Sequence, residues 1–205
     1  VEMLLKRGFD PKLTDIAGNN PLHLACASNR VANVMYWLNR FPNWNLEASN
    51  NITGGVALGV AVYMGPNRLE LTKLLLKAGA RIDSLTHTGT SILTSICSNE
   101  DADPDVLRFI LNHYTQNINF RMQATNSKWK IIHIIAKIAV RVFNTSNGLF
   151  QSLAKDSGST ALHYAARRGD IDIVEILLSE GADPSVRTYD VSCLHLSSCF
   201  FSSFS

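Results

Sequence analysis

One stretch of the chain decides the fold: Asp156-Ser157-Gly158-Ser159-Thr160-Ala161-Leu162-His163-Tyr164-Ala165-Ala166, continued by Ile173-Val174-Glu175-Ile176-Leu177-Leu178 and by Gly181-Ala182-Asp183. Its first part returns as Asn20-Pro21-Leu22-His23-Leu24-Ala25-Cys26 and, cut short, as Cys193-Leu194-His195-Leu196. The equivalent positions along the chain are His23, Gly59, Thr94, His133, His163 and His195, in steps of 36, 35, 39, 30 and 32 residues. A period of this size predicts a stack of similar small units.

The unit resembles the ankyrin repeat, whose T-P-L-H-x-A signature recurs about every 33 residues. The resemblance implies an all-α solenoid of paired antiparallel helices with short hairpin-like turns. In that family Gly158 would supply the positive φ of a tight turn, and Thr160 would cap the first helix. Apolar residues at helical spacing predict a second helix over 171–179, which Gly181 would end.

The resemblance covers nearly the whole chain, as a single array over residues 1–205. Val1, Leu5 and Gly8 correspond to Val174, Leu178 and Gly181 of the strong repeat, so we expect the chain to be a fragment that opens inside a repeat. The expected units are a partial repeat at 1–13, full repeats at 14–47, 48–83, 84–119, 120–154 and 155–187, and a truncated repeat at 188–205.

The repeat at 120–154 departs most from the pattern. Lys128 stands where the strong repeat has Gly158, and no Leu-Leu-x-x-Gly-Ala ending precedes Gln151. We therefore expect a short or displaced second helix and a local defect near 143–150. The acidic run at 100–105 has a structural interpretation, as a helix start with Asp103 as its cap, and an alternative one as a contact for a basic ligand or a metal.

Catalytic and metal chemistry are not expected. The histidines His23, His133, His163 and His195 occur one per repeat, so they cannot converge on one substrate atom, and we expect them to form hydrogen bonds between neighbouring turns. The Cys193-x-His195-x-x-x-Cys199 group lacks a fourth zinc ligand. Because no phosphate loop or nucleophile motif occurs either, the sequence predicts a protein that is not an enzyme, with no catalytic residue, cofactor or metal.

The cysteines and the hydrophobic pattern indicate the compartment. Cys26, Cys97, Cys193 and Cys199 occupy unrelated repeat positions, which favours free thiols in a reducing environment. We expect an intracellular protein, cytoplasmic or nuclear, or the cytosolic face of a membrane protein. The most apolar stretch, 131–143, contains charged residues and is shorter than the roughly 20 residues of a membrane span, so membrane insertion is not expected.

Charge is unevenly distributed. Between Asn112 and Lys155 there are six basic residues and no Asp or Glu. This segment favours an acidic partner at the 112–155 surface, and the alternative is a solvated surface without a partner. Nucleic-acid binding is not expected, because the segment has one Trp and no aromatic platform on which bases could stack.

The resemblance implies a protein-interaction module that binds a partner protein through its concave surface. The alternative is a regulatory or substrate-recruiting ankyrin segment of a larger enzyme or channel. Tyr63, Met64, Trp129 and Arg168 rank highest as contacts, because aromatic residues, Met and Arg are enriched in interfaces. The partner-binding residues carried over from the family are Asn19, Ser28, Tyr63, Met64, His87, Asn99, Trp129, Lys137, Asp156, Ser159, Arg167 and Arg168.

Overall fold

The structure, a computed structural model, describes residues 2–114, 116–143, 154 and 156–189, without the side chains of Leu4 and Phe143. Most of the expected defect at 143–150, and the truncated repeat beyond residue 189 with Cys193, His195 and Cys199, lie outside the described residues. The structure divides into two compact units, residues 1–84 and 85–205, which are described separately.

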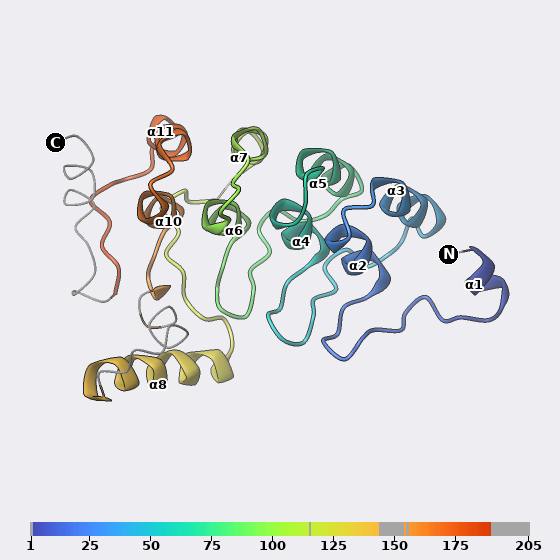
Figure 1. The fold of residues 1–205 in the computed structure, drawn as a ribbon, viewed down its shortest axis with the longest axis horizontal. Coiled ribbons are helices and arrows are strands. Elements are labelled where there is room, and N and C mark those ends of the chain that lie inside the picture. Colours follow the sequence, from blue (N-terminus) through green and yellow to red (C-terminus); the bar gives the residue numbers. More distant parts are fainter. Residues whose placement is uncertain (1, 115, 144–153, 155, 190–205) are drawn as a thin grey trace. The chain divides into compact units, whose positions relative to one another are not determined.

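Unit 1 (residues 1–84) contains five helices, which Figure 1 labels α1 to α5. Helix α2 pairs with α3 and α4 pairs with α5, while α2 also packs against α4 and α3 against α5. Leu22, Leu58, Leu71 and Leu75 fill the space between them and are almost fully buried. The helices are α1 (Glu2–Lys6), α2 (Pro21–Ala27), α3 (Val31–Arg40), α4 (Ala57–Tyr63) and α5 (Arg68–Lys77).

A reciprocal cap starts the first helix of a repeat. The Oδ1 atom of Asn20 accepts the backbone N–H of His23 at 3.0 Å, and Nδ1 of His23 accepts the backbone N–H of Asn20 at 3.2 Å. Because Nδ1 accepts, Nε2 carries the proton and donates to the carbonyl of Gly55 at 3.2 Å. The expected hydrogen bond between neighbouring turns is therefore confirmed at His23.

Unit 2 (residues 85–205) contains α6 (Ile92–Ser98), α7 (Pro104–Leu111), α8 (Ser127–Phe143), α10 (Ala161–Arg168) and α11 (Ile171–Ser179). As the sequence predicted, Asp103 caps α7, Thr160 caps α10, and α11 ends before Gly181, whose φ is +88°. Helices α6 and α7 form one pair and α10 and α11 another. The two pairs stack directly, α10 against α6 and α11 against α7.

This stacking shows that the interpretation of 120–154 as a stacked repeat was wrong. Direct contact between α6 and α10 leaves no room for a further helix pair between them. The stretch instead contributes the 17-residue helix α8, which lies outside the stack on the side of the turns (Figure 1). Lys128, which the sequence placed at a turn, is an exposed residue of this helix.

The turn of the fourth stacked repeat is assembled from two distant segments. In the first turn Asp15 donates its N–H to the carbonyl of Asn19 at 3.0 Å, and Gly18 donates to the carbonyl of Asp15 at 2.9 Å. In the fourth turn Met122 donates to Ser159 at 2.9 Å and Gly158 donates to Met122 at 2.8 Å. Met122 and Gly158 thus take the places of Asp15 and Gly18, although a long segment separates them.

A close backbone approach shows where the first half of this turn ends. A Cβ added to Gly18 would lie 2.8 Å from the backbone nitrogen of Asn51, which belongs to the next turn. In unit 2, a Cβ added to Gly89 would lie 2.8 Å from the backbone nitrogen of Gln123. Gln123 therefore occupies the place of Asn51. We call residues 124–156, which lie between the two halves of the turn, the insertion.

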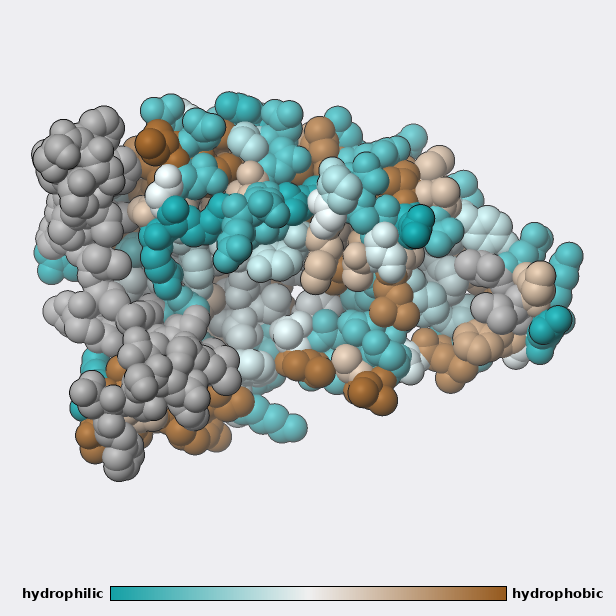
Figure 2. All heavy atoms as spheres, in the orientation of Figure 1, coloured by the Kyte–Doolittle hydropathy of each residue, from teal (hydrophilic) through white to brown (hydrophobic). Residues whose placement is uncertain are grey.

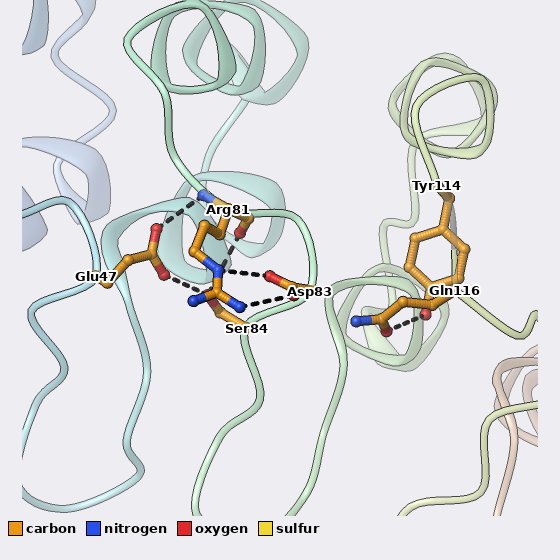
Figure 3. A network of polar contacts seen from close by, with 6 residues as sticks. All are labelled: Glu47, Arg81, Asp83, Ser84, Tyr114 and Gln116. Carbon is orange, nitrogen blue, oxygen red and sulfur yellow. Dashed lines mark hydrogen bonds and ion pairs between the residues drawn. The ribbon is translucent and has the colours of Figure 1, made fainter.

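Side-chain bonds between repeats lead to the same assignment. In unit 1 the carboxylate of Glu47 accepts the backbone N–H of Arg81 at 2.8 Å and the hydroxyl of Ser84, and Asp83 pairs with the Arg81 guanidinium at 2.8 Å (Figure 3). In unit 2 Oδ1 of Asn119 accepts the backbone N–H of Asp183 at 2.7 Å. The first bond spans 34 residues and the second 64, so the insertion adds about one repeat length to the chain without adding a layer to the stack.

Candidate protein-binding surface

Unit 1 exposes apolar side chains along its turns and the ends of its first helices. Ile16 and Ile52 stand at two adjacent turns, with Ile16 fully exposed and Ile52 exposed by 58%. Leu24 on α2 and Tyr63 and Met64 at the end of α4 are exposed by 41–46%. Ser28, at the end of α2, is exposed as well. The predicted contact residues Ser28, Tyr63 and Met64 are therefore exposed. We use the name turn-side surface for the exposed residues at the turns and first-helix ends of unit 1: Ile16, Leu24, Ser28, Ile52, Tyr63 and Met64.

Asn29 holds this surface together and was missed from the sequence. It has a φ of +53°, and its amide donates to the carbonyl of Met64 at 3.0 Å and accepts the backbone N–H of Asn67 at 2.9 Å. A Cβ on Gly65 would come within 2.5 Å of the Asn29 side chain. The only sequence signal was the longer link around Asn67, which gives Asn29 a backbone segment to bind.

Asn19 shapes the first turn. Its backbone and side-chain N–H groups donate to the carboxylate of Asp15 at 2.8 and 3.0 Å. The side-chain bond from Asn19 is the main cause that holds the pKa of Asp15 below its usual range. Asn19 is half-buried, and in this turn it supports the neighbouring exposed Ile16.

In unit 2 a polar cluster lies beside the split turn. Arg167 pairs with Asp156 at 2.9 Å, and its guanidinium carbon lies 4.7 Å from the centre of the Tyr164 ring. Burial raises the pKa of Tyr164, so the hydroxyl stays protonated, and it donates to the sulfur of Met122 at 3.6 Å. The predicted contact residues Asp156 and Arg167 therefore lie together, with Arg167 exposed at the surface.

Arg168 makes bonds within the protein, and its role as a partner contact stays a prediction. Its guanidinium donates to the carbonyls of Cys97 at 3.2 Å and Glu100 at 2.6 Å, and it pairs with Asp170 at 3.4 Å. Cys97 and Glu100 lie at the end of α6, where helical carbonyls lack partners within the helix. Arg168 thus ties α10 to the end of α6.

Asn99 and Ser159 also lie inside the protein. Asn99 is exposed by 8% and accepts the backbone N–H of Asp101 at 3.1 Å, and Ser159 is exposed by 1%. Both were predicted as surface residues because they flank a helix end or a turn. The two side chains are therefore buried, and a role for them in partner binding stays a prediction.

His87, Trp129 and Lys137 surround the base of the insertion. The carbonyl of His87 accepts the backbone N–H of Thr125 at 3.0 Å, and the Nζ atom of Lys137 donates to Oγ of Ser157 at 3.1 Å. The half-buried Trp129 ring lies 6.4 Å from the ring of the buried His133. His133 therefore belongs to α8 rather than to the series of repeat histidines.

The remaining chemical features are simple. Cys26 and Cys97 are free thiols, as expected, and burial raises the pKa of each to about 12, so they stay protonated. Within the described part of the chain, no group of three His, Cys, Asp or Glu side chains is placed to hold a metal. None of the helices described is long and apolar enough to cross a membrane.

Two stacked helix pairs per unit, short turns and reciprocal caps define a helical repeat protein whose turns and first helices present a binding surface. A family model described as ankyrin repeats (3 copies) matches residues 1–86 and 58–188. The chain belongs to the ankyrin-repeat family. Ankyrin repeats are protein-interaction modules, so these repeats form a protein-binding segment.

Several relatives share this architecture over part of their length. The chain is 28% identical over 193 residues to the ankyrin repeat protein nuc-2 of Neurospora crassa, covering 91% of this chain and 17% of the relative. It is 26% identical over 189 residues to the B-cell lymphoma 3 protein homolog of Mus musculus, covering 91% and 34%. It is 34% identical over 86 residues to the NF-kappa-B inhibitor alpha of Sus scrofa, covering 40% and 27%. The chain thus spans at most about a third of these relatives.

Proposed function

We propose that the protein binds its partner through the turn-side surface of unit 1, with the Asp156–Arg167 cluster as a second contact in unit 2. The observation that carries this proposal is the set of exposed apolar side chains Ile16 and Ile52, on two turns closed by internal hydrogen bonds, and Tyr63, at the end of α4 next to the link that Asn29 holds. Exposed apolar groups on a preorganised scaffold favour binding, because little conformational freedom is lost on association.

The role is regulatory rather than catalytic. One relative is named an inhibitor of NF-kappa-B, which supports a function in which binding changes the activity of a partner. The buried, protonated thiols of Cys26 and Cys97 support an intracellular location, cytoplasmic or nuclear. The basic residues between 112 and 155 support an acidic partner and give no base-stacking platform for nucleic acid.

A second candidate function is that of a regulatory or substrate-recruiting segment within a larger enzyme or channel. It is favoured by the share of the relatives that the chain matches, 17% of the ankyrin repeat protein nuc-2 and 34% of the B-cell lymphoma 3 protein homolog. Both candidates use the same surface, because in either case the ankyrin units supply recognition and any other activity lies elsewhere.

The test uses the full chain as bait in quantitative affinity purification. Ile52→Asp and Tyr63→Asp place a charge on the turn-side surface, and Met35→Asp, on the second helix α3 with 45% exposure, serves as the matched control. We expect the two surface variants to lose a set of partners that the control retains. Equal recovery of all partners by the three variants would exclude the turn-side surface as the binding site.

A further inference from the structure

Helix α8 has two apolar faces, and one of them is exposed. Ala136 and His133 are buried, and Trp129 on the same face is half-buried. The exposed face bears large apolar side chains, which Figure 2 shows in brown over α8. Their exposed fractions are 57% for Ile131, 56% for Ile134, 52% for Ile135, 49% for Ile138 and 68% for Val142.

These five residues form one continuous stripe. They occupy positions i, i+3, i+4, i+7 and i+11, which lie within about 100° of one another on an α-helix. The stripe faces away from Ala136 and His133, so it does not contribute to the core of unit 2. A contiguous apolar stripe of this kind on a soluble scaffold marks an interaction site.

The charges around the stripe have one sign. Helix α8 carries Lys128, Lys130, Lys137 and Arg141, and its sequence contains no Asp or Glu. At helical spacing Lys130 and Arg141 lie along one edge of the stripe and Lys128 along the other, and all three are exposed. An occupant of the stripe therefore fits best when it surrounds an apolar centre with carboxylates.

The side chains favour a shaped protein groove over a lipid surface. Helices that lie in a membrane interface place Trp, Phe or Leu on their buried face, whereas Trp129, the Trp of α8, is on the face turned toward its own unit. The stripe consists of four Ile and one Val, whose branched side chains are stiff at χ1 and suit a fixed pocket. The 17 residues of α8 give a docking element about 25 Å long.

We propose that α8 is a docking helix that places its stripe, Ile131 to Val142, in the apolar groove of an acidic helix-binding protein. Lys128 and Lys130, one along each edge of the stripe, then pair with carboxylates on the rim of the groove. This inference rests on the proposed function, because it assigns a partner class to the insertion. It also adds a contact that does not depend on the turn-side surface of unit 1.

Calcium-loaded calmodulin is the probe, since its Met-rich groove binds basic amphipathic helices. Titration calorimetry on the full chain should show calcium-dependent binding. The double variant Ile134→Asp/Ile138→Asp should weaken that binding at least about tenfold. Ile171→Asp is the matched control, because Ile171 is a helical isoleucine of unit 2 with 59% exposure, and it should bind like the unchanged protein.

Charge reversal and vesicles separate the alternatives. Lys128→Glu/Lys130→Glu should weaken calmodulin binding, more strongly at low salt than at high salt. Sedimentation with phosphatidylcholine vesicles that contain phosphatidylserine, in the absence of calmodulin binding, would overturn the proposal in favour of a lipid surface. A folded protein that binds neither probe would overturn it as well.

The inference and the proposed function can fail separately. Ile52→Asp leaves α8 unchanged and should leave calmodulin binding unchanged, while Ile134→Asp/Ile138→Asp leaves the turn-side surface intact. Calmodulin binding without any partner loss from Ile52→Asp would refute only the turn-side surface. Partner loss from Ile52→Asp without calmodulin binding would refute only the docking helix.

Discussion

Gly158 donates its backbone N–H to the carbonyl of Met122 at 2.8 Å and so closes a turn whose two halves are separated in sequence by the insertion. The N–H of Met122 completes the turn by donating to Ser159 at 2.9 Å. Because the turn closes on itself, α10 stacks on α6 as it would without the insertion. An ankyrin array has thereby acquired an additional helix without a change in its core.

Substitutions at two glycines distinguish the cost of a steric clash with a neighbouring turn from the cost of positive φ alone. Gly89 and Gly169 both have positive φ, +82° and +72°, but a Cβ on Gly89 would lie 1.9 Å from the carbonyl oxygen of Gln123, whereas nothing lies within 4 Å of one on Gly169. Gly169→Ala should cost about 1 kcal/mol from φ strain. Gly89→Ala should cost about 3 kcal/mol or more, because the next turn must move away. Equal losses in urea denaturation would show that Gln123 does not belong to the next turn.

Arg168→Ala should destabilise unit 2. The substitution removes hydrogen bonds from a charged donor to the carbonyls of Cys97 and Glu100, each typically contributing about 1.5–3 kcal/mol. Arg108→Ala is the control, since Arg108 is exposed and makes only a 3.4 Å pair with Asp105, and it should stay within about 0.5 kcal/mol. Indistinguishable urea midpoints for the two variants would contradict the structural role of Arg168.

Stability should fall in mildly acidic solution because of His23 and His163. Burial lowers the pKa of both side chains below 6.5, and the Nδ1 atom of each accepts the backbone N–H of its capping residue, Asn20 or Thr160, at 3.2 Å. Since the unfolded chain binds these protons more readily, stability is complete above about pH 6.5 and decreases as the pH falls toward the lower folded values.

The measurement is urea unfolding of the protein and of His23→Asn/His163→Asn at about pH 7.5 and 5.5. The double variant should be less stable at the higher pH but should lose less on acidification. A loss on acidification that is as large in the double variant would assign the pH dependence to other groups.

Local signals predicted the repeats well. The Thr160 cap, the Asp103 start of α7 and the 171–179 helix are confirmed, because each depends on residues within one turn of the helix. The sequence did not show that Asn99 and Ser159 are buried or that Arg168 bonds to α6. Their burial depends on which repeat is the spatial neighbour, and a repeat signature does not contain that information.

The insertion misled the sequence interpretation for a specific reason. It adds about one repeat length between Thr94 and His163, and His133 fell between these two markers at steps of 39 and 30 residues. The spacing of repeat markers cannot distinguish a stacked repeat from an insertion of the same length within a single turn. The missing Leu-Leu-x-x-Gly-Ala ending indicated that 120–154 is not a stacked repeat. The hydrogen bonds of Met122 to Gly158 and Ser159 show why: the turn closes across this segment.

Dipolar broadening between spin labels on α7 and α11 tests the split repeat most directly. Arg108→Cys and Glu175→Cys place labels at exposed positions of these helices in a background without the native cysteines. Packed helices lie about 10 Å apart, so direct neighbours broaden the spectrum, whereas helices separated by a further repeat lie about 20 Å apart. We predict the same strong broadening in the full chain and in a variant that lacks residues 124–156 and joins Gln123 to Ser157. Broadening that arises only after the deletion would show that 120–154 is a stacked repeat and would contradict the account.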